Sequence, residues 1–365
     1  LHPKIFGGIL ADRSNEYHMN DLESIGSREI DLVVVNLYPF VKEAVENNLP
    51  IEKAIEFIDI GGPSMLRAAA KNHSSVIPIS DKDDYNKFIS HYDHYAGNIP
   101  LDIRKKYATK IFHITSNYDY SISKYLEMLG NENDTLPHNI NINVKKDVEL
   151  RYGENPHQSA GFYIQAENKN SWIQLQGKKL SYNNYTDIES ALSIVQDFKR
   201  PSCSIIKHAN PCGFSVGDDI SKAFDRAVSC DPVSYFGGIV GFNRVVDLET
   251  AEKLTKPFLE CIVSPGYTEE GLSALSKKKN LRLIKINKSY VDTKFSIKNV
   301  LGGYLLQNKD AASLDLESCE IPTKIKPDSN TLSAMKLGWK LVKHVKSNAI
   351  VFANKHQLLG IGAGQ

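Results

Sequence analysis

The sequence has few cysteines, and no two of them are spaced C-x-x-C. Only five of its 365 residues are cysteine. They are scattered along the second half of the chain: Cys203, Cys212, Cys230, Cys261 and Cys319. An odd and dispersed set of thiols suits neither a disulfide framework nor a zinc knuckle. We therefore expect reduced cysteines and a cytoplasmic protein.

The sequence also lacks a long apolar run and an excess of charge of either sign. No stretch approaches the roughly 18 apolar residues needed to span a bilayer. The amino end has no basic region followed by an apolar one, as a signal peptide would. The 44 basic and 43 acidic side chains give a formal net charge of +1. We therefore expect no nucleic-acid or membrane partner, and any phosphate must be bound by local groups.

The spacing of apolar residues predicts an α/β fold, because strand-like and helix-like segments alternate. Residues 31–37 predict a buried parallel strand and residues 74–80 a second strand. Residues 51–58 have helical spacing, and apolar positions from Ile103 to Tyr125 predict one long amphipathic helix. Further strands are expected near 202–206, 237–242, 259–263, 281–286 and 301–306, with helices near 187–198, 219–229 and 247–256.

A polar stretch rich in asparagine divides the chain. Residues 130–147 lack periodicity and predict a linker between a first domain, residues 1–129, and a second, residues 148–312. Residues 313–365 begin without order and continue with a helical pattern near 332–345 and a strand over 349–354. This last segment predicts a linker and the start of a third unit, since a chain of this length commonly holds two or three domains.

An acid, a glycine turn and a helix start follow one another at residues 59–71. Two glycines precede Pro63, which suits a first helical position, so the unpaired N–H groups of the helix could bind an anion or a carbonyl oxygen. Asp59 lies just before the turn, and Lys71 lies about 12 Å along the axis from the helix start. The alternative is an ordinary glycine turn with a solvated lysine.

Residues 151–160, RYGENPHQSA, are dense in hydrogen-bond donors around a glycine and a proline. Such a segment suits a phosphate or a polar heterocycle, with Arg151 and Tyr152 as candidate contacts. A polar surface turn is the alternative. Two other segments, 231–244 and 358–365, mix glycine with strand formers and predict tight turns or a close backbone approach. The second, GIGAGQ at its end, lacks the third glycine of a dinucleotide fingerprint.

Residues 204–217, SIIKHANPCGFSVG, change abruptly from an apolar run to Lys207 and His208. The run predicts a strand, so the pair would lie at its carboxyl end, where open α/β sheets bind their ligands. The neighbouring ammonium disfavours a second positive charge on the imidazole, which suits a general base. The alternative is a lysine and a histidine that end a strand in solvent.

A zinc deaminase is a rival interpretation of the same segment. Its motifs are H-x-E and P-C-x-x-C. This sequence has Asn210 where the first motif needs glutamate and Ser215 where the second needs cysteine. The sequence therefore argues against a metal site here.

Nine motifs, in order along the chain, resemble those of one family. They are HPKIFGGIL, VVVNLYPF, IDIGGPSMLRAAAKNH, LRYGENPHQ, LSYNN, KHANPCG, SYFGGIVGFNR, KSNAIVF and GIGAGQ, and they cover essentially the entire chain. Together they resemble the bifunctional purine-biosynthesis enzymes that combine AICAR transformylase with IMP cyclohydrolase. The resemblance implies a fragment of such an enzyme without its N-terminal and C-terminal segments.

The resemblance implies a truncated methylglyoxal-synthase-like domain followed by cytidine-deaminase-like α/β transformylase subdomains. The first domain would close formyl-AICAR to inosine monophosphate (IMP) with loss of water. Tyr38, Asp59 and Lys71 would lie in its catalytic site.

The resemblance also implies that the later part of the chain moves a formyl group from 10-formyltetrahydrofolate to the amine of AICAR, with no metal required. His208 would be the general base, and Lys207 would assist proton movement. The residues implied in nucleotide binding come from several segments: Arg151, Tyr152, Asn184, Gly237, Glu260 and Asn348. A homodimer would build these sites, and the alternative is a nucleotide-binding or assembly fragment that catalyses neither step.

Overall fold

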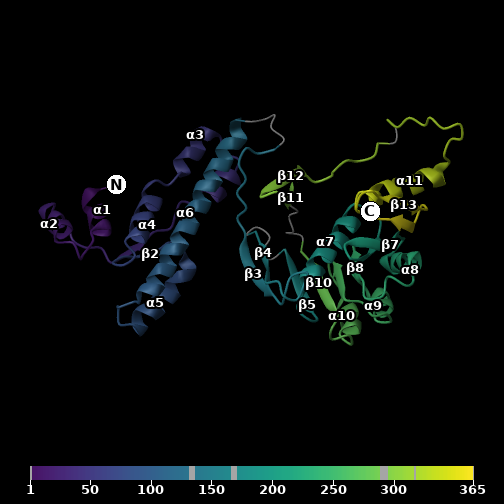
Figure 1. Ribbon diagram of the computed structural model, residues 1–365, viewed down its shortest axis with the longest axis horizontal. Helices are drawn as coiled ribbons and strands as arrows, with labels where there is room; N and C mark the ends of the chain where they lie inside the picture. Colours follow the sequence, from purple (N-terminus) through teal and green to yellow (C-terminus); the bar gives the residue numbers. More distant parts are fainter. Residues whose placement is uncertain (1, 131–135, 166–170, 288–294, 316–317, 365) are drawn as a thin grey trace. The chain divides into compact units, whose positions relative to one another are not determined.

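The computed structural model describes residues 2–130, 136–165, 171–287, 295–315 and 318–364 (Figure 1). The fold is mixed α/β, as the sequence predicts. The chain divides into two compact units, Leu1–Asn141 and Ile142–Gln365, and each is described by itself. Residues 131–135 of the predicted linker lie outside the described residues. The same holds for residues 1 and 365, at the two ends of the chain. Within the described part, no helix is both long and apolar enough to cross a membrane.

The first unit consists mainly of helices around two short strands. The helices are α1 (Pro3–Leu10), α2 (Glu16–Ser24), α3 (Ile51–Ala54), α4 (Gly61–Lys71), α5 (Tyr85–His94) and α6 (Leu101–Gly130). Shorter helical turns occupy Val41–Val45, Ile55–Phe57 and Lys82–Asp84. Strands β1 (Leu32–Val34) and β2 (Ile77–Ile79) pair in parallel.

Strand β1 corrects part of the prediction for residues 31–37. It is parallel, as predicted, but only three residues long. Leu32 and Val34 are exposed and only Val33 between them is buried, so one face alone packs on the unit's core. The prediction of a fully buried strand is therefore wrong for β1: helices α5 and α6 bury Ile77 and Ile79 of β2 on that second face, whereas Leu32 and Val34 stay exposed.

The long helix predicted from Ile103 is confirmed as α6 (Figure 1). Its buried positions include Tyr107, Ile111 and Tyr125, at the spacing that the sequence suggests. Helix α4 lies against it through small side chains at residues 68–70, which are all alanine and buried. This helix begins two residues before Pro63, so the proline is its third residue rather than its first.

The second unit contains a six-stranded mixed sheet in the order β5-β10-β9-β8-β6-β7. The strands are β5 (Trp172–Gln176), β6 (Ser202–Lys207), β7 (Asn210–Val216), β8 (Ile239–Phe242), β9 (Cys261–Ser264) and β10 (Arg282–Ile286). Strands β8, β9 and β10 are parallel, whereas β6 is antiparallel to both of its neighbours and β5 is antiparallel to β10.

Helices cover both faces of this sheet. They are α7 (Tyr182–Gln196), α8 (Ile220–Cys230), α9 (Leu248–Leu254), α10 (Glu269–Leu275) and α11 (Ser329–Val342). Helices α8, α9 and α10 pack with Ile205 on one face, and α7 and α11 pack with Ile206 on the other. Successive strand residues point to opposite faces, so the unit has three layers.

Three hairpins complete the second unit. They are β3 (Lys145–Leu150) with β4 (Ala160–Ile164), β11 (Phe295–Val300) with β12 (Gly303–Asn308), and β13 (Ile350–Ala353) with β14 (Leu358–Gly362). Leu337, Leu341 and Leu358 share the apolar core of α7, and the backbone N–H of Val216 bonds to the carbonyl of His356 at 2.8 Å. The segment after residue 329 therefore packs on this sheet.

Candidate functional site

The predicted basic pair lies at a tight turn at the end of β6. Lys207 is the last residue of that strand, and β7 begins at Asn210. His208 and Ala209 form the two-residue turn between them, with φ of 52° and 61°. Residues other than glycine rarely adopt such angles, although both central positions of a type I′ hairpin turn require them. Other contacts must therefore hold this turn.

The orientation of β6 corrects the expected position of the pair. Ile206 pairs with Ile239, the first residue of β8, and the two strands are antiparallel. The carboxyl end of β6 thus lies at the edge where β8, β9 and β10 begin. The pair therefore lies at the carboxyl end of its own strand, as expected, but this edge is not the carboxyl end of the parallel strands, because β6 runs antiparallel to β8.

Lys207 and Gly237 lie against each other at this edge. The Lys207 ammonium donates a hydrogen bond to the carbonyl of Phe236 at 2.6 Å. Gly237 has a φ of 70°, and a Cβ atom there would lie 3.4 Å from the Lys207 Nζ. The Gly237 N–H is held by the carbonyl of Phe258 at 2.8 Å. The positive φ therefore favours a glycine at position 237, whereas a Cβ atom there would make only an ordinary contact with the lysine.

Asn184 and Glu260 meet at the same edge. Asn184 is buried near the start of α7, where it forms a reciprocal capping box with Ser181. Its Nδ2 donates to Oε2 of Glu260 at 3.0 Å, and Arg282 Nη1 lies 3.6 Å from the same oxygen. Glu260 directly precedes β9, and Arg282 is the first residue of β10. Sequence reasoning missed Arg282, since only the parallel pairing of β9 and β10 places it here.

Asp187 is a second residue that sequence reasoning missed. It lies three residues after Asn184 on α7, and its Oδ1 accepts the backbone N–H of Ala209 at 2.7 Å. Burial raises the pKa of Asp187, while the Ala209 N–H and the charges of His208 and Lys207 oppose that effect. The carboxyl group thus lies within electrostatic reach of both members of the basic pair.

Arg151 and Tyr152 lie in the loop that joins β3 to β4. The Arg151 guanidinium is 5.6 Å from the centre of the Tyr152 ring. The hairpin packs beside α7, because Phe162 of β4 stacks on Tyr185 with ring centres 4.3 Å apart. Among the described residues, no hydrogen bond or ion pair joins Arg151 or Tyr152 to the basic pair.

Among the described residues, no hydrogen bond joins Asn348 to the turn, but a neighbour of Asn348 in the chain contacts it. The Lys346 N–H donates to Oδ1 of Asn210 at 3.4 Å, and Asn210 directly follows the turn. Asn348 itself accepts a hydrogen bond from the Ser347 hydroxyl at 3.0 Å. The loop between α11 and β13 therefore lies beside the turn.

In the first unit, Asp59 is held in place on both its side chain and its backbone. Its Oδ1 accepts the N–H of Gly62 at 2.8 Å, and its own N–H donates to the Tyr118 hydroxyl at 2.8 Å. The Tyr118 hydroxyl in turn donates to the carbonyl of Phe57 at 3.0 Å. A Cβ atom on Gly62 would lie 2.4 Å from the Asp59 carboxylate, so glycine permits the close approach.

Tyr38 and Lys71 lie in less constrained positions than Asp59. Tyr38 follows β1 and is 55% exposed. Burial raises the pKa of Tyr118, and the nearby acidic groups of Asp59, Asp119 and Tyr38 raise it further. Lys71 ends α4, ten residues after the helix begins, which corresponds to about 15 Å along the axis. The structure therefore joins Asp59 to Tyr118 and leaves Lys71 at the opposite end of the helix.

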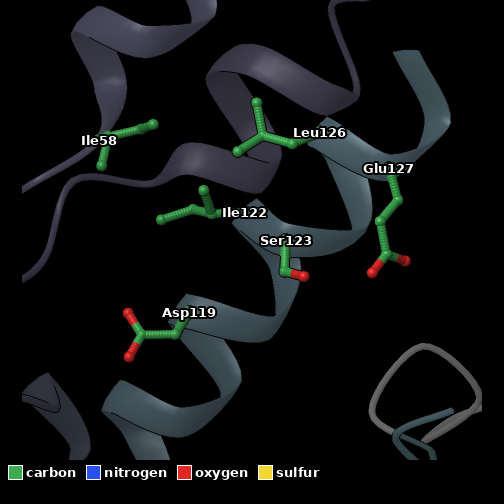
Figure 2. A pocket seen from close by; sticks show the side chains of 6 residues that line it. All are labelled: Ile58, Asp119, Ile122, Ser123, Leu126 and Glu127. Atoms are coloured by element: carbon green, nitrogen blue, oxygen red, sulfur yellow. The ribbon is translucent and has the colours of Figure 1, made fainter. Parts of the chain in front are cut away.

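A hollow of about 600 Å³ lies along the carboxyl-terminal half of α6 (Figure 2). Five of its six lining side chains come from α6, and Ile58 lies across from them: the set is Ile58, Asp119, Ile122, Ser123, Leu126 and Glu127. Its two carboxylates would repel a phosphate, and none of the predicted site residues lines it. The hollow is therefore no candidate for a nucleotide site.

Within the described ranges, no cluster of three or more His, Cys, Asp or Glu side chains is arranged to hold a metal ion. The three-layer unit, with a basic pair, an amide and carboxylates at one sheet edge, has the arrangement of an α/β enzyme. Comparison with known proteins gives the family.

The family model described as AICARFT/IMPCHase bienzyme matches residues 69–365. A bifunctional purine biosynthesis protein PurH from Bacillus mycoides is 45% identical over 371 residues, which cover 100% of this chain and 72% of the relative. PurH proteins of Bacillus thuringiensis and Bacillus cereus are 46% identical with the same coverage. A solved structure titled "Crystal structure of ForH" is 35% identical over 34% of this chain and 63% of its own, with a TM-score of 0.29.

The chain belongs to the AICARFT/IMPCHase bienzyme family. It is an enzyme of de novo purine biosynthesis, and its family combines AICAR transformylase with IMP cyclohydrolase.

Proposed function

We propose that the sheet edge at Lys207 and His208 carries the formyl transfer from 10-formyltetrahydrofolate to the amine of AICAR, which gives formyl-AICAR. The observation that carries this proposal is the convergence of the pair with Asn184, Gly237 and Glu260 at one edge. These residues come from separate segments, and the family's transformylase reaction needs both a base and a nucleotide pocket.

The chemistry explains why a basic pair is needed. The amine of AICAR is conjugated with an aromatic ring and a carboxamide, so it is a poor nucleophile. In our proposal, His208 takes a proton from the amine as its nitrogen attacks the formyl carbon, and Lys207 stabilises the developing oxyanion. The tetrahedral intermediate then collapses with cleavage of the bond between the formyl carbon and N10 of the folate, and the proton returns from His208 to that nitrogen, so that tetrahydrofolate leaves. Correct positioning of the two substrates supplies much of the remaining acceleration.

Groups on both sides of the Lys207–His208 pair would hold the nucleotide. We propose that Arg151 and Tyr152 contact it from the β3–β4 loop, whereas Asn184, Gly237, Glu260 and Asn348 complete its pocket. The hydrogen bond between the Asn184 amide and Glu260 supports this role, because it orients both side chains before any ligand binds.

We propose that ring closure of formyl-AICAR to IMP takes place in the first unit, with Tyr38, Asp59 and Lys71. The carboxamide nitrogen attacks the formyl carbon and water is lost, which requires a proton relay and a polar surround. Asp59 at the start of α4 suits the relay, since it is fixed by the Gly62 N–H. Lys71 would reach the same substrate only along the flank of the helix.

The finer assignments of fold and assembly belong to the same proposal. Residues 1–129 would form a methylglyoxal-synthase-like domain, residues 148–312 the first cytidine-deaminase-like subdomain, and residues 313–365 the start of the second. The protein would act as a cytoplasmic homodimer and would need no metal. Zinc analysis of the purified protein tests the last point, because stoichiometric zinc would favour a deaminase.

One experiment separates the enzyme from a scaffold of the same family. The purified chain is incubated with AICAR and 10-formyltetrahydrofolate, and release of tetrahydrofolate is followed by absorbance while AICAR binding is measured by calorimetry. Binding together with release supports the proposed transfer. Binding without release would favour a nucleotide-binding or assembly chain that catalyses neither step.

A further inference from the structure

The turn that carries His208 has an unfavourable backbone and a strong contact from helix α7. Both of its residues have positive φ, and neither is a glycine. The Ala209 N–H in this turn donates to Oδ1 of Asp187 at 2.7 Å. A hydrogen bond to a carboxylate is shorter and stronger than one between neutral groups. Asp187 therefore holds a turn that the residues of the turn would not favour by themselves.

Asp187 lies on helix α7, which is held in place at its start and along its buried face. Helix α7 is fixed at its start by the capping box of Ser181 and Asn184. Ile188, which follows Asp187, is buried in the apolar core beneath the sheet, and Ala191 one turn further on is fully buried. Helix α7 therefore sets the position of the Asp187 carboxylate, and the turn adopts the conformation in which Ala209 can donate to it.

The carboxylate also lies beside the reacting pair, because the N–H that it accepts belongs to Ala209, the residue directly after His208. Burial raises the pKa of Asp187, whereas His208 and Lys207 lower it. Asn184, one helical turn earlier on α7, bonds to Glu260. The same helix face therefore carries one residue for the proposed nucleotide pocket and one for the basic pair.

We propose that Asp187 is the positioning residue of the formyl transfer. By holding the Ala209 N–H, it fixes the turn and so directs the His208 imidazole toward the amine of AICAR. This inference rests on the proposed function of the Lys207–His208 pair. It assigns to Asp187 no contact with substrate, and it predicts an effect on turnover rather than on nucleotide binding.

The test compares three substitutions in the purified chain. Asp187→Ala removes the acceptor, whereas Asp187→Asn keeps an oxygen that can accept the Ala209 N–H but removes the charge. Asp247→Ala is the matched control, because Asp247 Oδ1 accepts the N–H of Thr250 at 2.8 Å beyond the far end of β8. Formyl transfer is measured as kcat and KM for AICAR, and hydrogen exchange of the Ala209 amide is followed by NMR.

We expect Asp187→Ala to lower kcat by roughly 100-fold, the loss that a misplacement of about 1 Å can cause. The KM for AICAR should stay close to its original value, because no binding group is removed. Protection of the Ala209 amide should be lost. Asp187→Asn should retain most of both kcat and amide protection, and Asp247→Ala should change neither.

Unchanged kcat in Asp187→Ala would overturn the inference, as would an equal loss in Asp187→Asn with the Ala209 amide still protected. A matching rise in KM would also overturn it, because Asp187 would then belong to the nucleotide pocket. If Asp187→Ala does not fold, Asp187→Ser applies the same criteria with a side chain too short to reach Ala209. His208→Ala tests the underlying function: full transfer in that variant refutes the proposed function itself, whatever Asp187 does.

Discussion

The two units hold their proposed reactive groups in different ways. In the second, groups from α7, β6 and the segments before β8 and β9 converge on one sheet edge, and the lysine, the amide and the carboxylates are each hydrogen-bonded. In the first, Asp59 is fixed by Gly62 and Tyr118, whereas Tyr38 is exposed and Lys71 lies at the far end of α4. A sheet edge brings distant segments together at a spacing of about 5 Å, and a single helix cannot do this for residues at its two ends.

The largest effect should come from His208→Ala. Loss of the base should lower formyl transfer by about 10²–10⁴-fold, and ring closure should remain nearly unchanged because its proposed residues lie in the other unit. Transfer is measured as tetrahydrofolate release, and closure as IMP formed from synthetic formyl-AICAR. An equal loss of both activities would contradict the separation of the two sites.

The opposite pattern is expected for Asp59→Ala. The proposed proton relay of ring closure loses its carboxylate, so IMP formation should fall by about 10²-fold or more. Formyl transfer should be retained, which makes each variant the control for the other. If ring closure survives, Asp59 is not part of that site.

Much of this contrast could be foreseen from the sequence, but only where the signal is local. The apolar run before Lys207 predicts a strand end, and the spacing from Ile103 to Tyr125 predicts α6, because both depend on neighbouring residues. The contacts of Asp187 and Arg282 with the site could not be foreseen, because each is made with a residue far along the chain.

The antiparallel direction of β6 could not be predicted from the sequence, for a related reason. Asn-Gly and Asp-Gly are the usual signals for a two-residue hairpin, whereas this turn consists of His208 and Ala209. The proline at position 211 and the glycine at 213 made the following strand resemble a loop, although β7 covers both. Tertiary contacts, including the one from Asp187, override these local preferences.

A smaller effect should follow from Gly62→Ala in the first unit. The added Cβ would lie 2.4 Å from the Asp59 carboxylate and 3.0 Å from Leu37, so the acid must move. We expect ring closure to fall by roughly 10-fold or more, since catalysis depends on positions within about an ångström. Gly61→Ala is the matched control, because nothing lies within 4 Å of a Cβ at that position. Equal activity of the two variants would show that the position of Asp59 is unimportant.

The smallest predicted effect concerns the end of α7 away from the proposed site. Asp197 lies 2.6 Å from His344 Nε2 and 2.8 Å from Lys343 Nζ, so it ties α7 to the end of α11. Burial alone would raise the pKa of Asp197, but these two partners outweigh it and lower the pKa below the usual 3.8. The stabilisation is therefore fully present above pH 3.8 and is lost as the pH falls through the lowered value.

Asp197→Asn should reduce the free energy of unfolding of the second unit by about 1 kcal/mol near pH 6, because the carboxylate is only partly buried. The difference from the original protein should shrink as the pH falls below 3.8, which urea unfolding across pH 2–7 would reveal. Asp218→Asn is the control, since its side chain is 76% exposed and lies 3.7 Å from Lys222. Formyl transfer should change little, because Asn184 and Asp187 lie near the other end of α7 and are held there by their own contacts. A large loss of transfer in Asp197→Asn would instead mean that the proposed site depends on the docking of α11.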